Sequence, residues 1–485
     1  MSIRRCLILG WMMAGLQVFS VSQEQPVQNP PTESPGDSSG SQRTAPAPAL
    51  SGIAGMQTGG DTDDSSDDLP VIPSLLGGQG TSTLSALKRS NYLNGGVNVT
   101  GAYDDNPLLV SSGATGNPSV SIFPSLGISE SSSRMRWSLG YAGGLTVNQS
   151  LPSENADSQS LNFESQFRLS PHVNLRVAEV FSLTTGFFDS GNGLGVGSTG
   201  PNPSLITPLA TQRSSATTVE SNYHFARNDL IGASGSYYDL DYTNTGAALG
   251  GQATQLTDTQ TASGSVFWLH RILPRDWGGL SYRFDRITLG GGSEETRVHS
   301  FVAVNSLSLS KRFALTGFIG PQYSENQGLV TGVTSPTQSS GWSVTGGADG
   351  AWKGVRTGIS GGYSRSISNG SGVLGVVRLQ NLHANFSRIL VPGWAVALYA
   401  NRGTNQSIIV PFANTANAIN VTSVGIALER NVGKSVGLRF GYTHDSQAQL
   451  GVPGPTLSSP TETLDANRNR VFVTLSYRWA KPLGM

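Results

Sequence analysis

The sequence predicts an all-β fold: a closed antiparallel transmembrane β-barrel of about 18 strands (16 possible), preceded by a disordered N-terminal periplasmic arm. Three observations predict it. From about residue 95 onward, segments of ten to fourteen residues alternate apolar or aromatic side chains with small or polar ones. Short and long connections take turns between these segments, as in outer-membrane barrels, where periplasmic turns are short and extracellular loops long. Tryptophans stand at both ends of one of these segments.

The stretch "GWSVTGGADGAWKG" (residues 341 to 354) illustrates the third observation. Trp342 and Trp352 are ten residues apart and, read with period two, share one face with Val344. Ten residues of strand at about 3.3 Å each, tilted by roughly 40°, rise about 25 Å, which is the height of the apolar band between the aromatic girdles of such a barrel. Strands of soluble sandwiches are usually only about 5 or 6 residues long. The stretch therefore indicates a membrane strand.

Residues 1–22 are predicted to be a secretory signal peptide. Arg4 and Arg5 precede an apolar run from Leu7 to Phe19 that is too short to span a bilayer, and small residues follow it. The only cysteine, Cys6, lies before this run, so we expect no lipid anchor, disulfide or cysteine metal site in the mature chain. No later stretch of 18 apolar residues occurs, so a membrane could be crossed only by a closed barrel.

Residues 23–90 are rich in Pro, Ser, Gly and Asp and are predicted to form the disordered arm. The aspartates between residues 61 and 68 resemble a calcium loop, but an EF-hand needs Gly at its sixth position and Glu at its twelfth, where this chain has Ser66 and Ile72. A solvated acidic linker is favoured, without a metal.

Residues 91–485 are predicted to form the barrel. An even number of strands places both termini on one side of the membrane, which we expect to be the periplasm. The expected strands lie near residues 96–103, 119–129, 134–146, 160–170, 173–184, 214–226, 229–242, 258–270, 276–288, 296–310, 313–325, 340–353, 355–367, 376–388, 394–403, 420–431, 434–446 and 468–479.

Two groups of side chains are expected to mark the faces of this barrel. The aromatic girdle is predicted to contain Trp137, Trp342, Trp352, Tyr442, Tyr477 and Trp479. Charge on a lipid-facing position costs about 2 to 4 kcal/mol for Arg or Lys at the midplane, so charges within strands should face the lumen. By alternation these lumen-lining charges are Arg136, Glu164, Arg168, Arg176, Asp349, Lys353, Arg356, Arg439 and Arg478. Several lie near turns, where an interfacial anchor is about equally expected, and the list leans basic.

Motifs of enzymes occur only in unsuitable contexts. "GISGG" (358 to 362) matches a nucleophile elbow, but Ser360 is predicted to lie mid-strand with no helix following. "GVGSTG" (195 to 200) matches a dinucleotide motif, yet Pro201 follows it. The six histidines have no metal-ligand spacing. We expect no enzyme, no cofactor and no metal, although a serine-histidine lipase in a barrel wall remains the enzymatic alternative.

Two short stretches carry a resemblance to known barrels. "GAYDDN" ends in Tyr103, Asp104, Asp105 and Asn106, which resembles the Tyr-Asp-Asp-Asn pattern near the first strand of porin-like barrels encoded with bacterial exopolysaccharide export genes. The last predicted strand, "RVFVTLSYRW", resembles the C-terminal signal read by the barrel-assembly machinery, but "AKPLGM" follows Trp479. In general porins the third loop narrows the lumen. The third loop here, residues 186–213, offers only Asp189 as a carboxylate.

These patterns predict a passive channel for small hydrophilic solutes, weakly charge-selective, in the outer membrane of a Gram-negative bacterium. The balanced charge of the chain gives no reason to expect nucleic acid as a partner. Expected partners are outer-membrane lipid, the barrel-assembly machinery, and solutes or polysaccharide, with a homo-oligomer possible. An exopolysaccharide-export barrel and a plugged structural or adhesive barrel are the alternatives.

Overall fold

The computed structural model describes residues 91–107, 113–152, 155–185, 210–245, 256–310, 312–328, 337–370, 374–408, 418–450 and 465–483. The predicted signal peptide (1–22), the predicted arm (23–90), the "GVGSTG" motif and most of the loop 186–213 lie outside these ranges.

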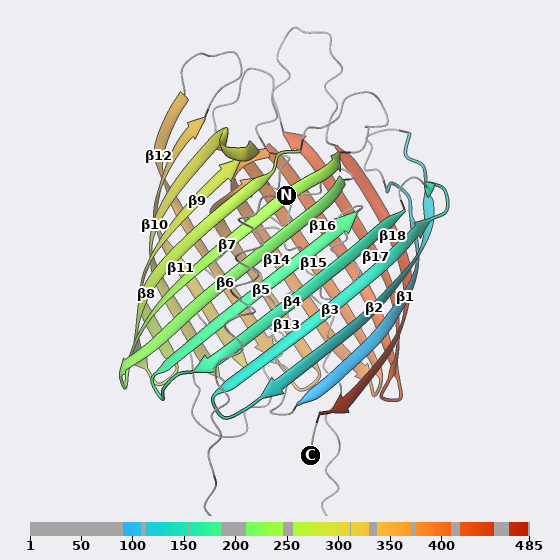
Figure 1. Ribbon diagram of the computed structural model, residues 1–485, viewed down its shortest axis with the longest axis horizontal. Coiled ribbons are helices and arrows are strands. Elements are labelled where there is room, and N and C mark those ends of the chain that lie inside the picture. The colour runs from blue at the N-terminus through green and yellow to red at the C-terminus, as the bar shows by residue number, and fades with distance from the viewer. Residues whose placement is uncertain are drawn as a thin grey trace, which may run out of the picture. The chain divides into compact units, whose positions relative to one another are not determined.

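The described residues form one closed antiparallel barrel of 18 tilted strands (Figure 1). Each strand pairs with its neighbours in sequence, and β1 also pairs with β18, which closes the wall. The strands are β1 (Tyr92–Asp104), β2 (Asn117–Ser131), β3 (Met135–Asn148), β4 (Ala156–Arg168), β5 (Val173–Thr185), β6 (Ala210–Ala226), β7 (Asp229–Thr245), β8 (Thr259–Leu273), β9 (Asp276–Leu289), β10 (Glu294–Ser310), β11 (Phe313–Gly328), β12 (Thr337–Lys353), β13 (Thr357–Gly370), β14 (Leu374–Val391), β15 (Trp394–Ser407), β16 (Ala418–Val432), β17 (Val436–Leu450) and β18 (Ala466–Pro482).

The predicted fold class and strand number are confirmed, and most strands are longer than predicted. The first was expected at 96–103 and spans Tyr92–Asp104, and the last was expected at 468–479 and spans Ala466–Pro482. Apolar alternation marks only the part of a strand that has an apolar outer face, whereas the backbone pairing continues into polar ends. After Trp479 the chain therefore remains in β18, and Pro482 pairs with Tyr92.

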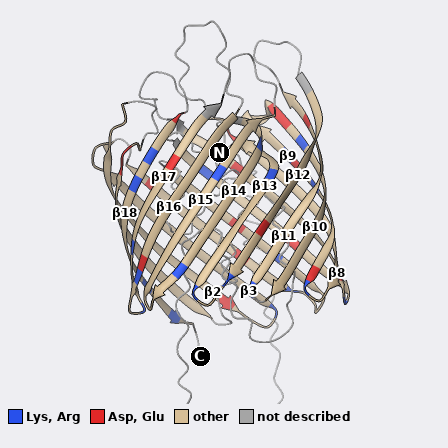
Figure 2. Cartoon of the chain, turned by 180° about the vertical axis from the view of Figure 1, so that it is seen from behind, with Lys and Arg blue, Asp and Glu red and all other residues tan. Residues whose placement is uncertain are grey.

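Side chains alternate between an exposed apolar outer face and an inner face. In β18, Val471, Val473 and Leu475 are exposed on the outer face, while Phe472 and Thr474 between them are buried on the inner face. Lys, Arg, Asp and Glu occupy only short parts of the strands in Figure 2. Among the described residues, no helix is long and apolar enough to cross a membrane.

The connections that follow the even-numbered strands are short and lie at one end of the barrel, which we call the turn end, and the other end is the loop end. Two connections at the loop end are also short. Residues 371–373 join β13 to β14, and only a 3-10 turn, η3 (Gly290–Gly292), and Ser293 join β9 to β10. The three glycines of η3 have φ values of 55°, 67° and 108°, which side chains with a Cβ rarely adopt. Glycine is therefore required for this tight connection.

Glu179 corrects the expectation that charges within strands face the lumen. It pairs with Phe163 and Thr217 in the row of outward residues, between the apolar neighbours Val177 and Phe181 of β5. Ser215 donates a hydrogen bond of 2.9 Å to one carboxylate oxygen, and Thr217 donates to the other. A carboxylate is accommodated on the outer wall because hydroxyls of the neighbouring strand satisfy both of its oxygens.

Candidate channel lumen

Most of the inner wall is built from small and polar side chains. On β12 and β13, for example, the inward positions include Thr345, Gly347, Ser360 and Ser364. Inward aromatic rings elsewhere in the wall lie over glycines of the neighbouring strand. A Cβ at Gly144 of β3 would overlap the ring of Phe123 of β2, and one at Gly441 of β17 would overlap that of Phe472 of β18. Rings held against the wall in this way take up little of the width of the lumen.

Arg176 organises a cluster of inward charges on β4, β5 and β6. Its Nε donates to Glu164 Oε1 at 2.8 Å, and its Nη1 lies 3.8 Å from Glu220 Oε2. Glu164 is buried, whereas Arg176 is about one-third exposed. One guanidinium between two carboxylates leaves this part of the wall acidic by about one charge.

Three further inward contacts join a carboxylate to a basic side chain, two of them through an arginine. Arg283 Nη2 lies 2.7 Å from Asp285 Oδ1 on β9. Arg439 on β17 lies 3.4 Å from Glu429 on β16. His383 Nε2 lies 3.3 Å from Asp349 Oδ1. The partners Glu220 and Glu429 were absent from the sequence-based list, because alternation gives the face of a residue but not its neighbour on the next strand.

The register places eight of the nine charges predicted to line the lumen on the inner face. Those near the turn end are Arg136, Arg168, Lys353 and Arg478, and the others are Glu164, Arg176, Asp349 and Arg439. Arg356 is different, because it lies in the exposed turn between β12 and β13 and not in the wall. The predicted strand, 355–367, includes Arg356, but the observed strand, β13, begins only at Thr357.

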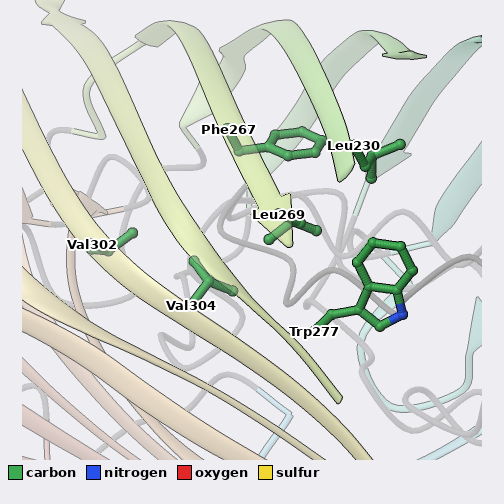
Figure 3. Close-up of a cluster of buried hydrophobic side chains, with 6 residues drawn as sticks. All are labelled: Leu230, Phe267, Leu269, Trp277, Val302 and Val304. Carbon is green, nitrogen blue, oxygen red and sulfur yellow. The ribbon is translucent and has the colours of Figure 1, made fainter. Parts of the chain in front are cut away.

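One arc of the inner wall is apolar, which the sequence did not predict. Six buried side chains from β7 to β10 form a cluster there (Figure 3), and Phe318 of β11 packs against it. They are Leu230, Phe267, Leu269, Trp277, Val302 and Val304. The runs "VFWL" (266 to 269) and "FVAV" (301 to 304) do not alternate, because both faces of these strands are apolar. We call this cluster the apolar arc.

The Tyr-Asp-Asp-Asn stretch joins the first strand to the last at the loop end. Asp104 accepts a hydrogen bond from Arg468 Nε at 2.5 Å, and both side chains are buried. Asp105 accepts two bonds of 2.6 Å from the backbone N–H and side-chain amide of Asn469. Asn106 donates to the carbonyl of Asn467 at 2.9 Å, while Tyr103 is exposed on the outer face. The motif therefore has a structural use as a clamp across the closing seam.

The aromatic residues predicted to form a girdle belong to the outward rows. Exposed on the outer face are Trp342, Trp352, Tyr442, Tyr477 and Trp479, and Trp137, which is half-buried, donates its Nε1 to Glu130 at 3.2 Å. Trp342 is the most exposed of them, at 71%, and its ring lies 5.2 Å from that of Tyr323. Trp268 and Trp394 also lie on the outer face near the turn end, and were not in the predicted list.

The described residues contain no group of three or more His, Cys, Asp or Glu placed to hold a metal. Ser360 of the "GISGG" stretch lies within β13, between Ala351 and Asn385 of the neighbouring strands. His270 bonds to Asp229, His299 to Tyr282 and His444 to Asn469, each at 2.8 or 2.9 Å. These contacts tie neighbouring strands together.

No family model matches the chain, and no curated protein matches it. Among solved structures, the chain is similar to the ferric citrate transporter FecA in its unliganded form, with a TM-score of 0.42 and 9% identity over 81% of this chain and 79% of that one. It is also similar to OpdL of Pseudomonas aeruginosa, with a TM-score of 0.39 and 11% identity over 81% and 98% of the two chains. At these values the likenesses assign neither a family nor a function.

Proposed function

We propose that this protein is a passive channel in the outer membrane of a Gram-negative bacterium, through which small hydrophilic solutes diffuse. The observation that carries the proposal is the closed wall of 18 strands, apolar outside and mostly polar inside. Strands about 4.8 Å apart and tilted by roughly 40° enclose a backbone cylinder about 35 Å across. Inward side chains as small as Ser, Thr and Gly do not fill that width.

The outer face supports a place in a membrane. A closed barrel satisfies most of its backbone hydrogen bonds between neighbouring strands, which is the condition for crossing hydrocarbon with β-strands. Exposed Trp and Tyr at the outer ends of strands fit the interfacial belts of such barrels. We place the turn end, where β1 begins and β18 ends, in the periplasm, and the loop end outside the cell.

Weak charge selectivity follows from the pairing of the inward charges. Arg176, Arg283 and Arg439 each face a carboxylate at 3.4 Å or less. Paired charges present a small net field to a passing ion, so pore width is expected to decide passage more than sign of charge. The exopolysaccharide-export alternative rests on the Tyr-Asp-Asp-Asn resemblance, and three of these four residues also hold the closing seam together.

Conductance in a planar lipid bilayer tests the proposal. The mature chain lacking residues 1–22 should give steady stepwise increases in the current across the bilayer. In a salt gradient, the reversal potential should be close to zero. The substitution Glu164→Gln should shift that potential toward anion selectivity, because it removes a carboxylate from Arg176. Glu179→Gln, on the outer face of the next strand, is the matched control and should not shift it. The absence of channel current from protein shown to be folded and inserted would contradict the proposal.

A further inference from the structure

The strands β12 and β13 separate above the middle of the wall. Their pairing runs from Lys353↔Gly358 at the turn end to Gly346↔Arg365 and covers eight residue pairs. Beyond that point β12 pairs with β11 as far as Thr337, and β13 pairs with β14 as far as Gly370. At the point of separation the side chain of Thr345 donates to the carbonyl of Arg365 at 2.9 Å. We call this opening toward the loop end the fork.

The strands beyond the fork lean toward the lumen. Val376 of β14 is buried against Ile287 and Leu289, which face inward from β9, and Ile367 and Ile408 pack on the same cluster. Since β10, β11 and β12 lie between β9 and β13 in the sheet, these contacts span part of the barrel mouth. They draw the upper ends of β13 and β14 away from β12.

A groove of about 630 Å³ lies on the wall beside the fork, over β10 to β13. Most of its lining comes from outward positions, and small residues leave room there, among them Gly317, Gly346 and Ala348. Ile319 and Val344 add apolar surface. The floor reaches Val304 and Phe318, which belong to the apolar arc of the inner wall or pack against it. A slot of this kind fits an alkyl chain and offers little to a sugar or a salt ion.

Arg365 places a cation in this apolar groove. The register sets it between Gly346 and Gln380, on the same side of the sheet as the exposed Tyr363 and Leu382. Its Nε is buried and has no hydrogen-bond partner among the described residues. No carboxylate of the described residues lies within 4.0 Å of the Arg365 guanidinium. Glu179 on the outer wall has both carboxylate oxygens satisfied, whereas an anion bound at Arg365 would satisfy its buried Nε.

A second guanidinium lies close to the first. Arg378 of β14 pairs with Ile367, so it stands diagonally across from Arg365, where such neighbours are about 7 to 8 Å apart. Its Nε is also buried without a partner among the described residues. Two such donors near the opening between β12 and β13 suit a phosphate or carboxylate, whose oxygens accept several N–H bonds at once.

We propose that the fork and its groove form a binding site for an amphiphile, with its anionic head group on Arg365 and its alkyl chain along Gly346, Ala348 and Ile319. Such a molecule can come from the membrane itself or from a solute that passes sideways between lumen and lipid. The site extends the chemistry of the barrel beyond hydrophilic solutes, and it does not depend on the lumen conducting ions.

Native mass spectrometry of the mature chain in dodecyl maltoside tests the site. The probes are monododecyl phosphate, with one chain, and dimyristoyl phosphatidic acid, with two. We expect one anionic probe per chain, not displaced by the neutral maltoside or by inorganic phosphate. Arg365→Gln should weaken binding by roughly tenfold or more, and Arg365→Lys by less, because a charge-assisted contact is lost in the first and kept in the second.

Two further variants separate the head-group contact from the alkyl slot. Ala348→Leu should weaken both probes by filling the groove while leaving Arg365 in place. Arg402→Gln, an exposed outward arginine on β15, is the matched control and should leave binding unchanged.

The outcomes are distinct. If the single-chain probe binds and its binding is weakened by the Arg365 and Ala348 substitutions, the site is supported and a permeating amphiphile is indicated. If only the binding of phosphatidic acid is weakened by these substitutions, the site is supported and a membrane lipid is indicated. Absence of binding, or binding indifferent to both substitutions, overturns the inference. A barrel that conducts ions but binds neither probe would overturn it while leaving the proposed channel intact.

Discussion

Two junctions of this barrel differ in a way that chain connectivity does not explain. The closing seam joins β1 to β18, the first and last strands, through thirteen residue pairs from Tyr92↔Pro482 to Asp104↔Arg470. The junction of β12 and β13 follows a short turn, yet it holds only eight pairs. A hairpin turn brings two strands together at one end, but the side chains along the strands decide how far the pairing continues.

The side chains of the two junctions account for the difference. At the seam, Thr100 and Thr474 share a hydrogen bond of 2.9 Å, and Asp104 and Arg468 form a buried ion pair at the loop end. At the fork, Val376 of β14 packs instead against Ile287 and Leu289 of β9 across the barrel mouth. The upper ends of β13 and β14 therefore lie away from β12, and the pairing stops at Gly346↔Arg365. The weaker junction lies in the middle of the chain.

Breaking the clamp at the seam should have the largest effect. Asp104→Ala removes the carboxylate that accepts from the Nε of the buried Arg468, and removing one partner of a buried pair costs up to roughly 3 to 5 kcal/mol. Urea unfolding in lipid vesicles, followed by the gel mobility of unheated samples, should show a loss of that size. Asp104→Ala combined with Arg468→Met should recover part of it. A single variant as stable as the parent would show that the seam does not depend on the clamp.

Engineered disulfides should distinguish the junctions next. The mature chain as predicted has no cysteine, so two introduced cysteines can form an intramolecular disulfide only with each other. Thr100→Cys with Thr474→Cys, at registered partners, should oxidise readily. Ser343→Cys with Ser368→Cys, which would be partners if β12 and β13 paired to their ends, should oxidise at least roughly tenfold more slowly, because Cα atoms more than about 7 Å apart cannot be bridged without backbone movement. Equal rates would mean that the fork is closed.

Filling matched glycines should have the smallest effect. A Cβ at Gly350 would meet only Leu315 at 3.8 Å, and one at Gly101, on β1, would meet nothing within 4 Å. Gly350→Val and Gly101→Val should each raise the free energy of unfolding by about 0.5 to 1 kcal/mol, because a β-branched residue favours an extended strand. The same urea titrations measure it. Destabilisation by either substitution would show that the glycine is needed for close approach.

Alternation along the chain was enough to predict the fold class, the strand number and the face of most inward charges. It could not predict contacts that depend on register between distant strands. Asp104 and Arg468 are 364 positions apart, and nothing local to either indicates the other. Glu179 was unpredictable for the same reason, since Ser215 and Thr217 satisfy it from the next strand.

Period-two alternation of apolar and polar side chains does not predict the apolar arc or the fork. The runs at 266–269 and 301–304 are visible in the sequence, but a strand with two apolar faces contradicts a polar lumen, so period two gave no inward assignment there. The fork is an absence of pairing within two strands that each alternate acceptably. Arg365 is the one sequence feature that could have indicated the fork. By alternation it falls on the outer row with Tyr363 and Ile359, where a charge is costly.

Amide hydrogen exchange of the mature protein in lipid vesicles, read by mass spectrometry of peptides, tests the contrast between the junctions most directly. The account predicts that amides of residues 341–345 and 366–370 directed into the fork exchange much faster than those of residues 97–101 and 471–475 at the seam, since backbone groups outside a ladder exchange first. Equal protection at both junctions would contradict it, and would leave Arg365 enclosed in a fully paired wall.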